Sequence, residues 1–179
     1  MVTLSELLSA HRARDSAEEG DLALVRELVR CAGDPWTREI PLHATASGLV
    51  VHPPTRRVLL RWHAWQQAWL QVGGHADPGE TDPLAVALRE GHEETGLTDL
   101  RPWPGAALVQ VAVVPVPAKG EEPAHEHADL RFLLATGTPG EVRPEKPGAR
   151  LRWLTVPEAH ELATEANVHQ LLDRAAELF

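Results

Sequence analysis

Residues 72–97, VGGHADPGETDPLAVALREGHEETGL, constrain this chain more than any other segment. They place a Gly-Gly pair and a Pro-Gly turn ahead of a run in which Glu90, Glu93 and Glu94 recur at helical spacing. Residues at positions i, i+3 and i+4 share one face of a helix, so the three carboxylates fall within one arc of roughly 100°. Like charges at i and i+4 repel unless a cation lies between them. The segment therefore predicts a helix with an acidic face.

The ends of this helix can be placed from its capping residues. Asp82 followed by Pro83 is a strong N-cap and first-turn pair, so the helix is expected to begin at Pro83. Gly96 stands where a left-handed residue would end the helix. The stripe opposite the glutamates is expected to face the core. It comprises Leu84, Ala87, Leu88, Gly91 and Thr95.

Taken alone, such a charge cluster usually forms a solvated helix face with one ion pair. Arg89 stands four residues before Glu93 and can brace it, which would leave Glu90 and Glu94 free for a metal. The upstream residues favour a site instead. Gly73 and Gly74 end a strand where a side chain would obstruct a ligand, and their carbonyls can serve as hard oxygen ligands. A loop closed by the Pro-Gly turn then delivers Glu80 just before the helix. An oxygen-rich cluster without thiolates suits magnesium or manganese rather than zinc.

The segment resembles the signature of the Nudix hydrolases: glycine, five residues, glutamate, seven residues, Arg-Glu, an aliphatic residue, any residue, Glu-Glu, any residue, glycine, an aliphatic residue. The named positions are supplied by Gly74, Glu80, Arg89, Glu90, Glu93, Glu94, Gly96 and Leu97. The resemblance implies an α/β fold, an α/β/α sandwich whose mixed β-sheet carries a central motif helix. It also implies a metal-dependent hydrolase that cleaves the diphosphate bond of a nucleoside diphosphate linked to another moiety, a nucleotide or nucleotide-sugar type of substrate.

The resemblance also implies roles for individual residues. Glu90 and Glu94 would be the main metal ligands, with the Gly73 carbonyl as a further one. Glu93 would be a ligand or the residue that handles the attacking water, and Arg89 would brace the site. Metals bridging a diphosphate neutralise it and activate water, whose proton a carboxylate then takes. Family members often add a glutamate from a loop beyond the box; the candidates here are Glu121, Glu122 and Glu126.

Two departures from the family pattern stand out. Eight residues separate Glu80 from Arg89 where the pattern has seven. Because the helical register is uninterrupted after its expected start, the extra residue falls in the loop, at Thr81 or Asp82, and only the reach of Glu80 toward a metal is put in doubt. Gly91 occupies the aliphatic position, which leaves a core position without a side chain at a helix-propensity cost of about 1 kcal/mol.

The segment HEHADLRF places His125, His127 and Asp129 on one face of a strand, because side chains alternate there. His-x-His spacing can bind a metal or contact phosphate, whereas the alternative is an exposed polar edge strand. We assign these three residues, with Arg61, to substrate binding. A second, independent metal site would make a zinc β-barrel protein possible, but the glycine pattern expected around such a site is missing. Arg61 itself is a phosphate clamp or a solvated charge. The tryptophans before the box could stack on a base or pack in the core: Trp62, Trp65 and Trp69.

Hydrophobic patterning divides the chain into residues 1–38, an N-terminal helical extension packed on the core, and residues 39–179, the Nudix-like domain. The extension should hold two helices, the first opened by a capping box between Thr3 and Glu6 and the second with one apolar stripe of Leu22, Val25, Leu28 and Val29. It could cap the pocket or form a homodimer. The strand-like segments are residues 43–52, 58–65, 68–74, 107–116, 125–136 and 149–156. An amphipathic helix should close the chain, with Val168, Leu171, Leu172, Ala175 and Leu178 on its apolar face.

The net charge and the lengths of the apolar runs limit which partners this chain can bind. A formal net charge of -9 argues against a nucleic acid polymer, because neutralising phosphates requires lysine and arginine. We find neither an apolar run long enough to cross a bilayer nor the apolar core of a signal peptide, so we expect no membrane association and a cytoplasmic location. Cys31 cannot form an internal disulfide, which agrees with that location. We expect it to be a small core residue rather than a nucleophile.

Three functions compete at this stage. The first is an active hydrolase with a small diphosphate substrate and magnesium or manganese. The second is a nucleotide-binding or regulatory domain that keeps the fold without the chemistry, as the loop insertion and Gly91 would allow. An isoprenoid diphosphate isomerase, which shares the fold, ranks last because Cys31 lies far in sequence from the box.

Overall fold

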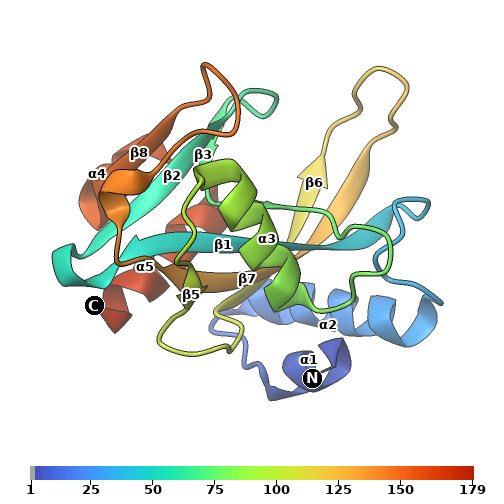
Figure 1. The fold of residues 1–179 in the computed structure, drawn as a ribbon. Coiled ribbons are helices and arrows are strands. Elements are labelled where there is room, and N and C mark those ends of the chain that lie inside the picture. The colour runs from blue at the N-terminus through green and yellow to red at the C-terminus, as the bar shows by residue number, and fades with distance from the viewer. Residues whose placement is uncertain (1–2) are drawn as a thin grey trace.

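The computed structural model describes residues 3–179, which form an eight-stranded sheet with helices on both faces (Figure 1). The helices are α1 (Leu4–Ala10), α2 (Ser16–Cys31), α3 (Pro83–Thr95), α4 (Val156–Leu162) and α5 (Ala166–Leu178), with short 3₁₀ turns at Pro53–Thr55 and Pro139–Glu141. The strands are β1 (Leu42–His52), β2 (Arg57–His63), β3 (Ala68–Leu70), β4 (Val72–Gly74), β5 (Arg101–Pro102), β6 (Gln110–Val116), β7 (His125–Ala135) and β8 (Leu151–Thr155).

Strand β1 lies at the centre of the sheet. One edge pairs in parallel with β7, and the other pairs antiparallel with β4 and then with β2. Strands β6 and β5 pair with the far edge of β7, while β3 and β8 pair with β2. The predicted mixed sheet is confirmed, and its topology brings the Gly-Gly end of β4 beside the middle of β1.

Two apolar clusters fill the space between sheet and helices. One joins side chains of α1, α2 and α3 to the sheet, and the other joins α4 and α5 to the opposite face. Alternation along β1 divides its residues between them: Ala44, Ala46 and Val50 face the first cluster, and Leu49 and Val51 face the second. The predicted α/β/α sandwich is confirmed, with α3 visible in front of β1 in Figure 1.

Helix α3 has the predicted ends. The Asp82 carboxylate accepts hydrogen bonds from the N–H groups of Leu84 and Ala85. Pro83 is the first helical residue, and Gly96 ends the helix with a φ of 68°. The predicted core stripe was partly wrong, because Leu84 and Leu88 are only half-buried. Val86 is buried instead.

The reason is that the inward stripe of α3 runs through Glu94, which lies eight residues after Val86 on the same face and is itself buried. The structure also explains the second departure from the family pattern, Gly91 at the aliphatic position. A Cβ at Gly91 would lie 2.8 Å from Leu100 Cδ1, so Leu100 fills the space that the family's aliphatic side chain would occupy. Gly91 is buried in the core as expected, and Leu100 supplies the apolar atoms that its missing side chain does not.

The N-terminal helices are present, and Thr3 and Glu6 form the predicted capping box. Leu22 and Val25 of α2 are buried as expected. The expectation for Cys31 was wrong, because its side chain is exposed and lies 3.1 Å from Glu27 Oε1. Cys31 follows Val25 by six residues, which leaves it about 120° away from the buried stripe around the helix axis.

Two elements were not predicted. Strand β5 has only two residues and shows no alternation to detect. Helix α4 begins with a capping box between Thr155 and Glu158, a signal that the sequence does contain. In the described part of the chain, no helix combines the length and apolar character that crossing a bilayer requires.

Candidate active site

Glu94 is the most buried carboxylate of α3, with 8% of its surface exposed. One carboxylate oxygen accepts a hydrogen bond from the Gly73 N–H at 3.2 Å, and the other lies 3.1 Å from an Arg61 guanidinium nitrogen. Burial raises the pKa of Glu94 to about 7, and the nearby charges of Glu90 and Glu145 add to the effect. Burial thus disfavours the anionic form of Glu94 even beside the Arg61 guanidinium.

Glu90 lies against the backbone of Gly74. A Cβ at Gly74 would come within 2.7 Å of the Glu90 carboxylate carbon, so a side chain here would displace that carboxylate. Burial also raises the pKa of Glu90, although Arg89 partly offsets this. The Gly73–Gly74 backbone therefore contacts the carboxylates of Glu90 and Glu94, which lie one turn apart on α3. Burial disfavours the charged form of both.

Arg89 holds the loop and the helix together. Its Nε and Nη atoms donate to both oxygens of Glu80 at 2.9–3.1 Å and to the His75 carbonyl at 2.8 Å. Its Nη1 donates to Glu90 at 2.9 Å and to Glu93 at 3.1 Å. The expectation that Arg89 braces Glu93 is confirmed, but the expectation that it leaves Glu90 free was wrong. Both carboxylate oxygens of Glu80 accept hydrogen bonds from Arg89. With the extra residue in the loop, Glu80 thus pairs with Arg89.

These contacts give matched predictions for the glycines. Gly74→Ala should lower turnover by roughly a hundredfold, because the Glu90 carboxylate must move to admit the methyl group. The unfolding free energy should change by less than about 1 kcal/mol, since a flexible side-chain end is all that moves. Steady-state kinetics and urea unfolding measure both effects.

Two other glycines calibrate this test. Gly105→Ala should change neither quantity, because nothing lies within 4 Å of its added Cβ. Gly73→Ala should destabilise the fold itself, because Gly73 has a φ of 152° and its Cβ would lie 2.3 Å from that of Ser47. A Gly74→Ala protein with unchanged turnover would contradict the placement of Glu90.

A cavity of about 400 Å³ adjoins Gly73 and Gly74. It lies beside the middle of β1, and its lining includes Arg61, Gln71, Trp65, His75, His127, Asp129 and Arg131. Asp129 is buried in its floor, where its carboxylate accepts hydrogen bonds from Thr45, Ser47, Gln71 and Arg131 at 2.7–3.2 Å. Because four side chains donate to it, the Asp129 carboxylate can hold these residues of the cavity wall in place.

The two histidines of the HEHAD strand belong to a larger cluster. His125 and His127 lie on one face of β7 with their Nε2 atoms 3.1 Å apart, and His43 and His75 join them. One ring nitrogen from each of the four lies within 4.8 Å of the others. Burial lowers the pKa of His127 to about 3 and that of His75 to about 4. The His75 and His127 imidazoles are therefore neutral at physiological pH.

The remaining candidates lie in different surroundings. Glu122 pairs with Arg38 at 2.8 Å, and alternation directs Glu126 away from the face that carries His125 and His127. Glu121 is exposed on the loop before β7. Among the tryptophans, Trp69 is buried in the core and Trp62 packs edge-on against it. Trp65 is 44% exposed beside the cavity.

Sequence reasoning missed three residues of this region. His43 and His75 enter the cluster through tertiary structure: β1 pairs in parallel with β7, so His43 lies opposite His127. Glu145, on the segment before β8, acts on Glu94 through its charge. No local pattern marks any of the three, although a His two residues before an alternating run such as Thr45 and Ser47 could have pointed to a polar strand face.

Comparison with known proteins agrees with this geometry. The chain matches the family model of the NUDIX domain over residues 41–174. An 8-oxo-(d)GTP phosphatase of Mycolicibacterium smegmatis is 29% identical over 159 residues, which cover 89% of this chain and 43% of that protein. A probable DHNTP pyrophosphohydrolase of Lactococcus lactis subsp. cremoris is 36% identical over 74 residues, 40% of this chain and 42% of that protein. The chain thus spans less than half the length of these curated relatives.

Solved structures share the fold. An Ap4A hydrolase of C. elegans superposes with a TM-score of 0.59 at 21% identity, covering 75% of this chain and 95% of that one. The dihydroneopterin triphosphate pyrophosphohydrolase of E. coli gives 0.58 at 17% identity, covering 73% and 92%. With the family model matched over most of the chain and the box residues assembled around Gly73–Gly74, this chain belongs to the Nudix family.

Proposed function

We propose that the chain is a metal-dependent pyrophosphohydrolase that cleaves the diphosphate bond of a nucleoside diphosphate linked to another moiety. The observation that carries this proposal is the packing of the Glu90 and Glu94 carboxylates against the Gly73–Gly74 backbone, in the order of the Nudix box. The family match and the curated relatives, named as a phosphatase and a pyrophosphohydrolase, support it. In this proposal residues 39–179 are the catalytic domain.

The box residues fit magnesium or manganese. The donor set is carboxylate and carbonyl oxygen, which hard divalent cations prefer. Burial raises the pKa values of Glu90 and Glu94 even though an arginine lies beside each, so a divalent ion would stabilise their charged forms further. We assign Glu90, Glu94 and the Gly73 carbonyl as ligands. When bound, the metal would neutralise the diphosphate and activate water for attack on phosphorus.

The side chains around these ligands have distinct tasks. Arg89 fixes Glu90 by direct hydrogen bonding and fixes the loop through Glu80 and the His75 carbonyl. We therefore assign Glu80 as a positioning residue rather than a ligand. Glu93 takes the third position, as a ligand or as the acceptor of the water's proton, because Arg89 holds it beside Glu90.

An acid outside the box would complete the machinery. Glu122 is committed to Arg38, whereas Glu145 carries its charge close to Glu94. We add Glu145 to Glu121, Glu122 and Glu126 as a candidate for the distal base. A Glu145→Gln protein should show an altered dependence of kcat on pH if Glu145 takes this role.

The cavity supplies the substrate-binding part of the proposal. Arg61 and Arg131 bring positive charge to its wall, and Trp65 offers an aromatic face at the same cavity. A phosphate chain can thus lie along Gly73–Gly74 while a base stacks on Trp65. The nucleoside triphosphate in the name of the M. smegmatis relative fits this class, because a nucleoside triphosphate is a nucleoside diphosphate linked to phosphate.

A substrate panel tests the proposal. Nucleoside triphosphates, dinucleoside polyphosphates and nucleotide sugars would be incubated with the protein and magnesium, and the products read by mass spectrometry with the Glu94→Gln protein as the blank. We expect at least one compound to be split at a diphosphate bond by the wild-type protein alone. Tight nucleotide binding without turnover across the panel would instead identify a binding domain.

A further inference from the structure

Four histidines from separate parts of the chain converge beside the Nudix box. His43 comes from β1, His75 from the loop after β4, and His125 and His127 from β7. The Nε2 atoms form two close pairs, His43 with His75 and His125 with His127, each at 3.1 Å. One ring nitrogen from every histidine lies within 4.8 Å of the other three. The cluster contains no carboxylate, in contrast to the glutamate site on α3.

Backbone carbonyls fix the orientation of two of these rings. The His43 Nδ1 lies 3.0 Å from the Ile40 carbonyl, and the His125 Nδ1 lies 3.0 Å from the Pro123 carbonyl. A carbonyl only accepts hydrogen bonds, so each Nδ1 carries the proton and each Nε2 presents its lone pair to the cluster. Histidines that bind metals characteristically donate their second N–H to a carbonyl or carboxylate in this way.

We propose that this four-histidine cluster binds one divalent transition-metal ion of the zinc class, separate from the magnesium site. Zinc–nitrogen bonds of about 2.0–2.1 Å place the nitrogens of a tetrahedral site about 3.3 Å apart. The two close pairs at 3.1 Å already have nearly this spacing, and because all four nitrogens lie within 4.8 Å of one another, the two pairs would need only to move closer around the ion. Imidazole nitrogens favour zinc, copper or nickel over magnesium.

Binding of the ion would change the tautomers of two histidines without changing the number of protons on them. Without an ion, His75 and His127 can donate from Nε2 to the lone pairs of His43 and His125. To bind the ion, each moves that proton to its own Nδ1, so the neutral rings keep their charge while all four Nε2 lone pairs face the metal.

The location gives the ion a task. It would join β1 and β7 to the loop that begins at His75. The carbonyl of His75 accepts a hydrogen bond from Arg89, and the same loop carries Glu80, the main partner of Arg89. Fixing His75 would thus hold the loop against the arginine that orients Glu90 and Glu93. This role does not depend on which substrate the box hydrolyses.

Metal retention tests the proposal directly. Untagged protein would be stripped with a chelator, given zinc in the presence of excess magnesium, passed through a desalting column and assayed for bound metal. Cobalt would be added in a parallel sample, because tetrahedral cobalt absorbs visible light far more strongly than octahedral cobalt. We compare the wild type with the His125→Gln/His127→Gln double variant and with His75→Gln.

Two controls separate this site from others. Glu94→Gln removes a magnesium ligand, and His160→Gln removes a histidine that pairs with Asp173 on the α4–α5 face. We expect one zinc per chain and a tetrahedral cobalt spectrum in the wild type and in both controls. The double histidine variant should lose affinity by at least a hundredfold while its circular dichroism without metal matches that of the wild type.

Failure of this proposal is distinct from failure of the hydrolase proposal. A wild-type protein that retains no zinc, or a double variant that retains it equally well, would overturn the four-histidine site whatever the turnover. Should the double variant be unfolded, His75→Gln provides the same comparison, since His75 lies in a loop and its loss must lower zinc affinity if the site exists.

Discussion

Glu94→Gln is expected to lower magnesium-dependent turnover by at least about a thousandfold, which corresponds to about 4 kcal/mol of activation free energy. Glutamine has the same shape but cannot supply the negative charge that holds the metal. The fold should survive, because the Gly73 N–H can still donate to the amide oxygen and the loss of a disfavoured buried charge is not costly. Steady-state rates as a function of magnesium concentration measure the effect.

A matched substitution controls for removal of a glutamate elsewhere. Glu161→Gln lies on α4, where the side chain is exposed and remote from α3, and should leave turnover unchanged. If Glu94→Gln kept turnover within about tenfold of the wild type while folding normally, the assignment of Glu94 as a metal ligand would be wrong.

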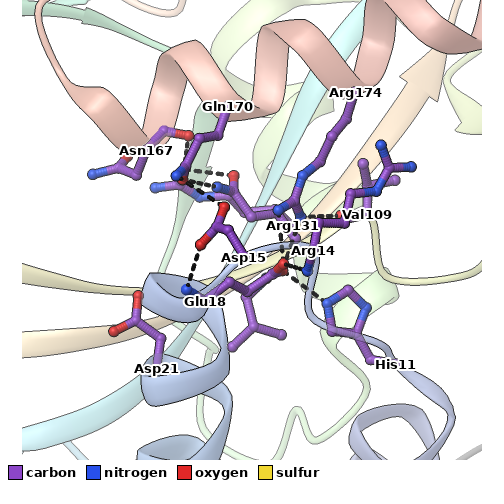
Figure 2. A network of polar contacts seen from close by, with 12 residues as sticks. His11, Arg14, Asp15, Glu18, Asp21, Val109, Arg131, Asn167, Gln170 and Arg174 are labelled. Atoms are coloured by element: carbon purple, nitrogen blue, oxygen red, sulfur yellow. Dashed lines mark hydrogen bonds and ion pairs between the residues drawn. The ribbon is translucent and has the colours of Figure 1, made fainter.

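The second large effect concerns stability and the N-terminal extension. Glu18 of α2 is 2% exposed, and Figure 2 shows it between His11 and Arg174. Arg174 of α5 donates to both Glu18 oxygens at 2.7–2.8 Å, and the Val111 N–H adds a bond from β6. Glu18→Ala would leave the Arg174 guanidinium buried without its counter-charge. We expect a loss of about 3–5 kcal/mol in unfolding free energy, measured by urea denaturation.

The control and the reverse test use the same helices. Glu19→Ala, at the exposed neighbouring position, should cost less than about 0.5 kcal/mol. Replacing Glu18 and Arg174 together by methionine should be less harmful than Glu18→Ala alone, since no unpaired charge remains. If Glu18→Ala unfolded at the same urea concentration as the wild type, the extension would not be coupled to the core through this pair.

The same ion pair predicts a dependence of stability on pH. Burial alone would raise the pKa of Glu18, but hydrogen bonds from His11, Arg174 and Val111 outweigh it and hold the pKa well below the usual range. A carboxyl group with a lowered pKa in the folded state stabilises the protein above its unfolded pKa of about 4.3 and loses that contribution as pH falls. Between about pH 6 and pH 3 the wild type should therefore lose more stability than Glu18→Gln.

This coupling bears on the role of residues 1–38. Leu4, Leu8, Leu22 and Val25 lie in the same apolar cluster as side chains of α3 and the sheet. We propose that the extension is part of one folding unit with residues 39–179 rather than a lid that opens over the pocket. A lid would have few buried contacts with the sheet, whereas α2 packs along β6 and supplies a buried charge to α5.

The sequence predicted best what is decided locally. The ends of α3 follow from Asp82, Pro83 and Gly96, whose capping preferences act within one helical turn, and this located the extra residue in the loop. The spacing of Glu90, Glu93 and Glu94 likewise fixed their shared face. Cys31 was misplaced because its burial depends on which face of the last turn meets the core, and composition alone does not determine that.

Features that depend on tertiary contact could not be predicted. Leu100 fills the space beside Gly91 from a position nine residues later in the chain, after the helix has ended. His43 reaches His127 only because β1 and β7 pair in parallel in a particular register. Arg89 pairs mainly with Glu80 because the loop folds back on α3. The sequence identified the box residues that we propose as metal ligands, whereas the contacts between them required the fold.

The most direct test of the central claim is turnover in water labelled with oxygen-18, using the substrate found in the panel. If Glu90 and Glu94 hold a metal that activates water for attack on phosphorus, a phosphoryl product of the wild-type protein will carry the label. Labelling should require magnesium or manganese and be absent from the Glu94→Gln reaction. Label incorporation at the same rate without metal, or in Glu94→Gln, would contradict the account.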